Sequence, residues 1–270
     1  MIEFINQTLI NAWSMCGERV RRRWIEGDII PPGIAARIGT GVHSGADVNY
    51  SAKIKTGEDE PLDVVLDAAR DGYVKSVSDN GVFFPPEEKP SAQKQLEDGI
   101  DTVVELTRLY REECAPQVLP ILVEEEIFLN DPDLDIPFRG TLDVLADDRA
   151  LRDIKTSARK WPQSKADTSV QPTLYNELVK EKTGSYPERI VYDIFTKTKK
   201  PAYQVMETTR QPGDFETLKL RVKLMMQSIT AGIFPPAEPG HWCCSPKWCG
   251  YYYSCPHIPA HKKILPKRSE

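Results

Sequence analysis

Two aspartates stand ten residues apart in the stretch 140–155, which reads GTLDVLADDRALRDIK. The pattern is typical of two short strands joined by a polar turn. If the turn is the three-residue loop 147–149, Asp143 lies opposite Asp153, with about 5 Å between their Cβ atoms. Carboxylates at that separation repel each other, and a cation between them removes the repulsion. Oxygen ligands of this kind suit Mg²⁺ or Mn²⁺ better than Zn²⁺.

Side chains alternate along a strand, so the sequence also predicts which residues share a face. On the first strand, one face is expected to carry Thr141, Asp143 and Leu145, and the other Leu142 and Val144. On the second strand, Leu151, Asp153 and Lys155 are expected to share a face. Lys155 would add a positive donor beside the Asp153 carboxylate. The same residues also fit a surface hairpin whose acids face water, which is where charged side chains are usually found.

The flanking chain must supply the elements that hold this hairpin. Apolar periodicity predicts helices over 2–24, 63–77, 92–114, 169–182 and 214–231, and strands over 121–129, 189–195 and 202–208. This order indicates a mixed α/β fold, with a central mixed β-sheet flanked by helices. The strand 121–129 reads ILVEEEIFL, and its three glutamates fit a solvated rim, although one of them could join a metal shell.

Composition limits the class of protein. The chain has 270 residues, of which 40% are hydrophobic and 28% charged, as expected for a globular protein. No apolar run approaches the roughly 20 residues of a membrane span, and the N-terminus does not read as a targeting segment. We therefore expect an intracellular, cytoplasmic protein. The net charge of −5 does not indicate nucleic-acid binding, but basic clusters such as 19–23 and 197–200 allow local positive strips.

Six cysteines are unevenly distributed, at positions 16, 114, 243, 244, 249 and 255. A secreted disulfide framework is not expected in a chain of this size without a signal peptide, so metal ligation is the better interpretation of the four near the C-terminus. Cys114 falls in a predicted helix and is expected to be a buried or free thiol.

Four short motifs, in chain order, resemble those of the RecB-like branch of the PD-(D/E)XK nuclease superfamily, which includes phage exonucleases and CRISPR-associated nucleases with an iron-sulfur cluster. The motifs are GTGVH at 39–43, GTLD at 140–143, Asp153-Ile154-Lys155, and Gln171 with Tyr175. The resemblance implies a restriction-endonuclease-like core. It also implies a divalent cation, Mg²⁺ or Mn²⁺, bound by His43, Asp143, Asp153 and the backbone carbonyl of Ile154.

The same resemblance implies roles for the remaining motif residues. Lys155 would orient a water or stabilise developing negative charge, and Gln171 and Tyr175 would position the Lys155 region and the DNA backbone. The expected function is a metal-dependent DNA exonuclease that processes single strands or free ends in phage or bacterial recombination or repair. A recombination protein is a possible partner. A phage-encoded protein would act in the host cytoplasm. The alternatives are a catalytically inactive DNA-binding or scaffold module with a structural metal and, less favoured, an RNA nuclease.

Relatives with a cluster carry one cysteine near the N-terminus and three near the C-terminus, so the resemblance implies a [4Fe-4S] cluster on Cys16, Cys244, Cys249 and Cys255. Many relatives have C-x2-C-x5-C, whereas Pro246 stands here at the first cysteine position, leaving Cys244 or Cys243 to serve. A structural Zn²⁺ is the alternative, although zinc sites usually use paired short spacings. The expected organisation is a nuclease domain over 1–235 and a cysteine segment over 236–270, packed on the N-terminus.

Overall fold

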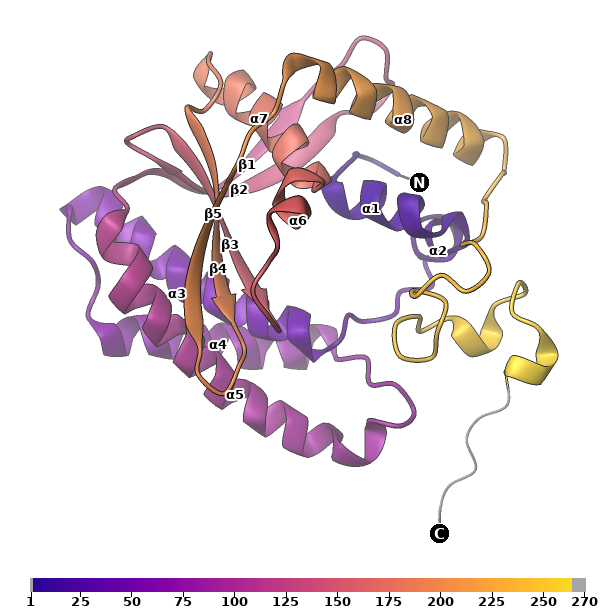
Figure 1. The fold of residues 1–270 in the computed structure, drawn as a ribbon, viewed down its shortest axis with the longest axis horizontal. Helices are drawn as coiled ribbons and strands as arrows, with labels where there is room; N and C mark the ends of the chain where they lie inside the picture. The colour runs from indigo at the N-terminus through magenta and orange to yellow at the C-terminus, as the bar shows by residue number, and fades with distance from the viewer. Residues whose placement is uncertain (1, 264–270) are drawn as a thin grey trace.

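A five-stranded mixed sheet forms the centre of the protein in a computed structural model that describes residues 2–263 (Figure 1). The strands lie in the order β1-β2-β3-β4-β5 and span Pro120–Leu129, Phe138–Ala146, Ala150–Ser157, Arg189–Thr196 and Ala202–Thr208. Only β3 and β4 run parallel; every other neighbouring pair in this described sheet is antiparallel. The predicted mixed α/β class is confirmed.

Helices cover both faces of the sheet (Figure 1). They are α1 (Gln7–Met15), α2 (Gly17–Val20), α3 (Ile34–Thr56), α4 (Leu62–Asn80), α5 (Ala92–Leu109), α6 (Gln163–Asp167), α7 (Val170–Thr183) and α8 (Pro212–Thr230). One layer contains α3, α4 and α5, and the opposite layer contains α1, α7 and α8. None of the helices in residues 2–263 is both long and apolar enough to cross a bilayer.

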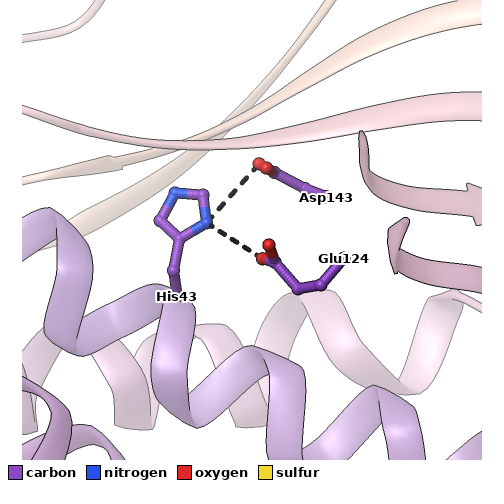
Figure 2. Close-up of side chains that lie close together, drawn as sticks. All are labelled: His43, Glu124 and Asp143. Atoms are coloured by element: carbon purple, nitrogen blue, oxygen red, sulfur yellow. Dashed lines mark ion pairs between the residues drawn. The ribbon is translucent and has the colours of Figure 1, made fainter. Parts of the chain in front are cut away.

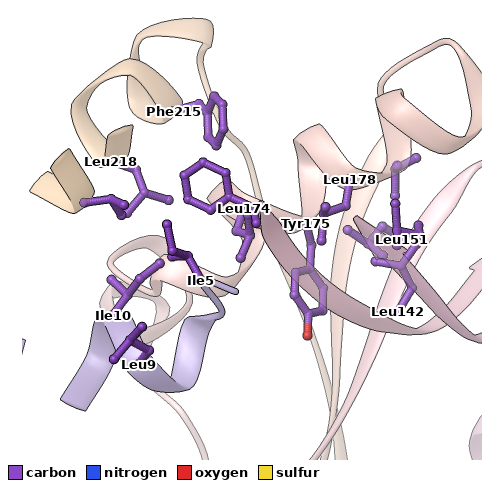
Figure 3. Close-up of a cluster of buried hydrophobic side chains, with 14 of the residues drawn as sticks. Ile5, Leu9, Ile10, Leu142, Leu151, Leu174, Tyr175, Leu178, Phe215 and Leu218 are labelled. Atoms are coloured by element: carbon purple, nitrogen blue, oxygen red, sulfur yellow. The ribbon is translucent and has the colours of Figure 1, made fainter. Parts of the chain in front are cut away.

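Two hydrophobic cores hold these layers on the sheet. The core on the α7 side joins α1, α7 and α8 to the strands through residues such as Leu9, Leu142, Leu178 and Phe215 (Figure 3). The core on the α3 side includes Val42, with Val65, Val103 and Phe195. The sheet is therefore apolar over much of both faces, and buried polar atoms without a hydrogen-bond partner, such as Thr107 Oγ1 and Asp153 Oδ2, are few among the described residues.

Helix α3 was not predicted, because its glycines weaken the helical pattern. Packing explains them: a Cβ at Gly41 would lie 2.9 Å from the carbonyl oxygen of Ala69, and a Cβ at Gly45 would lie 2.9 Å from that of Val65. The small residues let α3 and α4 approach closely. This packing stabilises α3, although its glycines have a low intrinsic helix propensity.

The predicted single helix over 2–24 is wrong. Ile5 forms an isolated bridge to Phe138, and Cys16, with an extended backbone at φ −172° and ψ 110°, separates α1 from α2. The amide of Gly17 then donates to the carbonyl of Pro235 at 2.7 Å instead of continuing a helix. A tertiary contact thus breaks the helix at the cysteine.

The β2–β3 hairpin has the predicted three-residue loop. Leu145 pairs with Leu151 and Val144 with Arg152, and Arg149 closes the turn in the left-handed region at φ +59°. The ladder ends there, and the Asp143 carboxylate accepts a hydrogen bond from the Ile154 amide at 2.7 Å. The predicted register is therefore confirmed beside the turn, and the two strands separate where the aspartates begin.

The predicted faces of β2 are wrong at the same point. Leu142 and Leu145 both belong to the core on the α7 side, whereas Val144 belongs to the core on the α3 side. Asp143, expected beside Leu145, instead faces α3. In the neighbouring strand, Glu124 adopts φ +45°, a left-handed conformation that interrupts the alternation of side chains. The irregularity therefore involves both β1 and β2, and Asp143 and Val144 both face α3.

Candidate active site

His43, Glu124 and Asp143 converge between α3 and the sheet (Figure 2). His43 Nδ1 lies 3.7 Å from Glu124 Oε1 and 3.6 Å from Asp143 Oδ2. One potential ligand atom from each residue lies within 4.8 Å of the other two. An imidazole nitrogen with two carboxylate oxygens is a donor set that divalent cations such as Mn²⁺ and Mg²⁺ accept.

Glu124 is the functional candidate that the sequence alone did not single out. In the EEE run of β1, Glu125 forms an ion pair with Lys182 of α7, and Glu126 forms one with Arg139 of β2. Strict alternation would turn Glu124 and Glu126 to the same face. Glu125 and Ile127 face α7, so alternation turns Glu124 toward α3, and the left-handed backbone at Glu124 brings Val123 to the same side. The EEE run was a usable signal, but the position of His43 on α3 decides which glutamate joins the site.

Both backbone groups of Ile154 are held by site residues. His43 Nε2 lies 3.0 Å from the Ile154 carbonyl oxygen, and Asp143 Oδ2 accepts from the Ile154 amide. The carbonyl expected to face a cation therefore contacts the histidine in this structure. Burial lowers the pKa of His43, but the carboxylates of Asp143 and Glu124 together outweigh it and the pKa rises to about 9. A cation at this site must displace that proton, because a metal-bound imidazole nitrogen cannot carry one.

Asp153 and Lys155 lie on the α7 side of the His43 group. Lys155 Nζ is 2.5 Å from Asp153 Oδ2, and the two side chains form an ion pair. Among residues 2–263, no donor has hydrogen-bond geometry to Asp153 Oδ2. Burial raises the pKa of Asp153 above its usual range, with Lys155 opposing that shift. Within residues 2–263, the group of ligand atoms lying within 4.8 Å of one another does not include Asp153. The structure thus holds Asp153 against the lysine, beside the His43 group.

Gln171 and Tyr175 lie one turn apart on α7 and contact the site in different ways. Gln171 Nε2 donates to Asp153 Oδ1, so the amide fixes the carboxylate that pairs with Lys155. The Tyr175 ring packs over Gly140, where an added Cβ would lie 2.7 Å from Tyr175 Cε1. The glycine of the GTLD motif therefore lets α7 lie close against β2.

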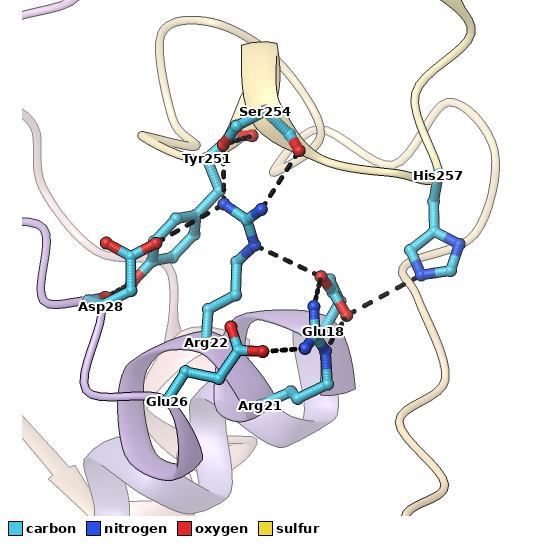
Figure 4. A network of polar contacts seen from close by, with 8 residues as sticks. All are labelled: Glu18, Arg21, Arg22, Glu26, Asp28, Tyr251, Ser254 and His257. Carbon is cyan, nitrogen blue, oxygen red and sulfur yellow. Dashed lines mark hydrogen bonds and ion pairs between the residues drawn. The ribbon is translucent and has the colours of Figure 1, made fainter.

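The cysteine segment, residues 236–263 of the described chain, packs against the N-terminal helices (Figure 1). Arg22 donates to the Ser254 hydroxyl at 2.6 Å, and its guanidinium lies 5.2 Å from the centre of the Tyr251 ring (Figure 4). The Tyr251 hydroxyl in turn donates to the carbonyl of Asp28. The remaining residues of the predicted segment, 264–270, lie outside the described chain.

The N-terminal and C-terminal cysteines lie near one another. Burial raises the pKa of Cys244 to about 11, and the neighbouring thiols of Cys243, Cys16 and Cys255 contribute to the rise. Cys243 is engaged elsewhere, with its sulfur 2.9 Å from His241 Nδ1. Within residues 2–263, no three cysteine sulfurs lie within 4.8 Å of one another. A single tetrahedral Zn²⁺ would need sulfurs about 3.8 Å apart, so the arrangement is wider than a zinc site.

Cys114 lies apart from this group. It is buried in the core on the α3 side, with its sulfur 3.7 Å from the Tyr50 hydroxyl. The expected buried thiol is confirmed.

Comparison with known proteins gives a family match over most of the chain. A family model described as the PD-(D/E)XK nuclease superfamily matches residues 15–256. A crystal structure from Eubacterium rectale, of a protein whose assignment as an exonuclease is provisional, is similar with a TM-score of 0.56 at 13% sequence identity, over 90% of this chain and 87% of that one. At that identity the likeness concerns the fold alone. No curated protein matches the sequence.

Proposed function

This chain belongs to the PD-(D/E)XK nuclease superfamily, and we propose that it is a divalent-metal-dependent deoxyribonuclease. The observation that carries the proposal is the convergence of His43, Glu124 and Asp143 beside the Asp153–Lys155 pair. The nitrogen donor and the carboxylates can hold a divalent cation that activates a water. The neighbouring lysine can stabilise the negative charge that develops during phosphodiester hydrolysis.

In this proposal, His43, Glu124 and Asp143 hold Mg²⁺ or Mn²⁺, and Asp153 joins them from β3. The bound cation would lower the pKa of a water and offset charge on the phosphodiester. Burial opposes protonation of Lys155, but the carboxylates of Asp153 and Asp143 together outweigh it and keep the pKa of the lysine above its ordinary value. Lys155 therefore remains a cation that can stabilise negative charge as it develops on the substrate.

Gln171 supports this arrangement without touching the substrate. Its amide occupies Asp153 Oδ1, which leaves Asp153 Oδ2 directed at Lys155. Tyr175 fixes the distance between α7 and β2 through its contact with Gly140. Both are positioning residues in this scheme. We further propose exonuclease action on single strands or free ends, in phage or bacterial recombination or repair; this finer assignment rests on the resemblance of the motifs.

The cysteines are proposed to hold a [4Fe-4S] cluster through Cys16, Cys244, Cys249 and Cys255. The proximity of Cys16 and Cys255 to Cys244 supports one shared site that joins the two chain ends, and the contact between Cys243 and His241 supports Cys244 as the ligand. Anaerobically purified protein should be brown and contain iron. A colourless sample with stoichiometric zinc would overturn this part of the proposal.

The EEE run of β1 provides the test of the cation site with its own controls. Glu124→Gln removes one carboxylate from the site, whereas Glu125→Gln and Glu126→Gln remove the same charge from neighbouring positions whose ion pairs lie elsewhere. We expect Glu124→Gln to weaken Mn²⁺ binding by about 10- to 100-fold or more, because even supporting residues of metal sites contribute that much. Calorimetric titration with Mn²⁺ measures the affinity.

Cleavage of end-labelled single- and double-stranded DNA with Mg²⁺ or Mn²⁺ gives the second measurement. The Glu124 variant should lose most of its cleavage rate, and the two control variants should retain theirs. Equal activity in all three variants, or no cleavage by the wild-type protein with any of these substrates, would refute the nuclease assignment. DNA binding without Mn²⁺ binding would instead favour a non-catalytic binding module.

A further inference from the structure

A cavity of about 730 Å³ lies apart from the His43 group, at the junction of the two chain ends. The N-terminal helices form one wall and the cysteine segment forms another, with loop 83–88 opposite and the start of α3 at its base. The proposed catalytic scheme assigns this cavity no role.

The cavity concentrates positive charge on a protein whose net charge is −5. Arg19, Arg23 and Lys247 line it, and Glu88 is the single acid among its described lining residues. No acidic side chain in residues 2–263 forms an ion pair with any of these three cations. Cations without acidic partners in a partly enclosed space attract phosphates, and they do so more strongly than scattered surface cations.

Aromatic rings accompany the cations. The Arg23 guanidinium lies 5.3 Å from the centre of the Trp24 ring, and Lys247 Nζ lies 5.4 Å from the centre of the Trp248 ring. Trp248 is 55% exposed, although large aromatic side chains are usually well buried. Exposed aromatic rings next to basic groups are the combination that binds single-stranded nucleic acid, in which bases stack and phosphates pair with cations.

The cavity lies close to the candidate active site along α3. Ala36 lines the cavity and His43 follows seven residues later, so both lie on the same face of α3 about 10 Å apart. Between them, a Cβ at Gly39 would be 3.5 Å from Thr156 Oγ1, an ordinary contact, so α3 packs directly against the end of β3 there. The separation of about 10 Å along α3 is what connects the cavity with the cation site.

We infer that this cavity holds the unpaired strand of a DNA substrate next to the His43 site, an inference that rests on the proposed nuclease function. A space of about 730 Å³ suits a few unstacked nucleotides. The cysteine segment supplies Lys247, Trp248 and Tyr251 to the wall. Its attachment to the N-terminal helices therefore controls strand affinity, while the cation site performs the chemistry.

The test measures binding without cleavage. Fluorescence anisotropy in EDTA compares a labelled single strand of about 15 nucleotides with a blunt duplex of the same sequence. We expect tighter binding of the single strand and a loss of about 5- to 100-fold in Trp248→Ala, the effect of removing one base-stacking ring. Phe128→Ala is the control, because Phe128 is a 47% exposed aromatic residue of β1 that does not line the cavity, whereas Trp242 packs edge-on against Trp248.

The cations are tested by the salt dependence of binding. Arg23→Gln and Lys247→Gln should each reduce the slope of log affinity against log salt by about 0.7, the value for one phosphate contact on a single strand. Lys223→Gln, on α8 and outside the cavity, should leave the slope unchanged. Lys247 is exposed, so its variant is expected to fold.

Wild-type affinity in Trp248→Ala and an unchanged slope in Lys247→Gln would overturn the inference, as would preference for the blunt duplex. These outcomes are separate from those of the nuclease assay. Cleavage with Mn²⁺ but no effect of the cavity variants would leave the proposed function standing and refute the cavity. If the cavity variants bind as expected but neither the wild type nor any variant cleaves DNA, the cavity inference stands and the proposed nuclease function is refuted.

Discussion

Gly140→Ala tests whether the glycine of the GTLD motif fixes the distance between α7 and β2. The added methyl carbon would lie 2.5 Å from Leu178 Cδ1 and 2.7 Å from Tyr175 Cε1. Ordinary carbon contacts are about 3.5–4.0 Å, so α7 or its side chains must move by about 1 Å or more. Leu178 is fully buried, and its surroundings leave little room for such a movement.

The expected cost follows from this displacement. Overpacking of a close-packed core typically destabilises a protein by about 1–3 kcal/mol. The same shift carries Gln171 away from Asp153, and a misplacement of about 1 Å in a catalytic group can reduce a rate about 100-fold. Urea unfolding gives the free energy, and cleavage of labelled DNA gives the rate.

Gly213→Ala is the matched control, because nothing lies within 4 Å of a Cβ at that position in α8. It should leave the rate unchanged and alter the free energy of unfolding by no more than about 1 kcal/mol, in the stabilising direction. If Gly140→Ala unfolds and cleaves like Gly213→Ala, Gly140 does not set the position of α7 and the role given to this contact is wrong.

Three further predictions concern stability. Arg152 donates to both carboxylate oxygens of Asp193, at 2.9 and 2.7 Å. Asp193→Asn should lower the free energy of unfolding by about 3–5 kcal/mol, because it leaves Arg152 as a buried charge without its partner. A urea midpoint equal to that of the wild type would contradict this. The hydrogen bond from Arg21 lowers the pKa of Glu18 in the folded state, so this stabilisation is present above the ordinary glutamate pKa and is lost as pH falls through the folded value. The stability difference between wild type and Glu18→Gln should therefore shrink between about pH 5 and pH 3, and a constant difference would refute the assignment. Removal of iron or zinc with a chelator should lower the unfolding temperature and loosen the cysteine segment, which limited proteolysis would detect, whereas unchanged melting and cleavage patterns would argue against a structural metal.

The sequence by itself determined the local geometry around the hairpin. Leu145 pairs with Leu151 and the loop has three residues, because polar turn residues between two apolar runs allow few other registers. The ion pair of Asp153 with Lys155 also follows from alternation, since β3 remains a regular strand along its length.

Tertiary structure decided which residues meet across the elements. Alternation places Glu124 and Glu126 on one face of β1, but only the packing of α3 brings His43 to Glu124, while Glu126 pairs with Arg139. Helix α3 exists despite Gly41 and Gly45 because those glycines admit α4, so the stability of the helix lies in a contact with a distant segment. Alternation and propensity are properties of neighbouring residues, whereas the meeting of His43, Glu124 and Asp143 depends on how α3 packs against two strands of the sheet.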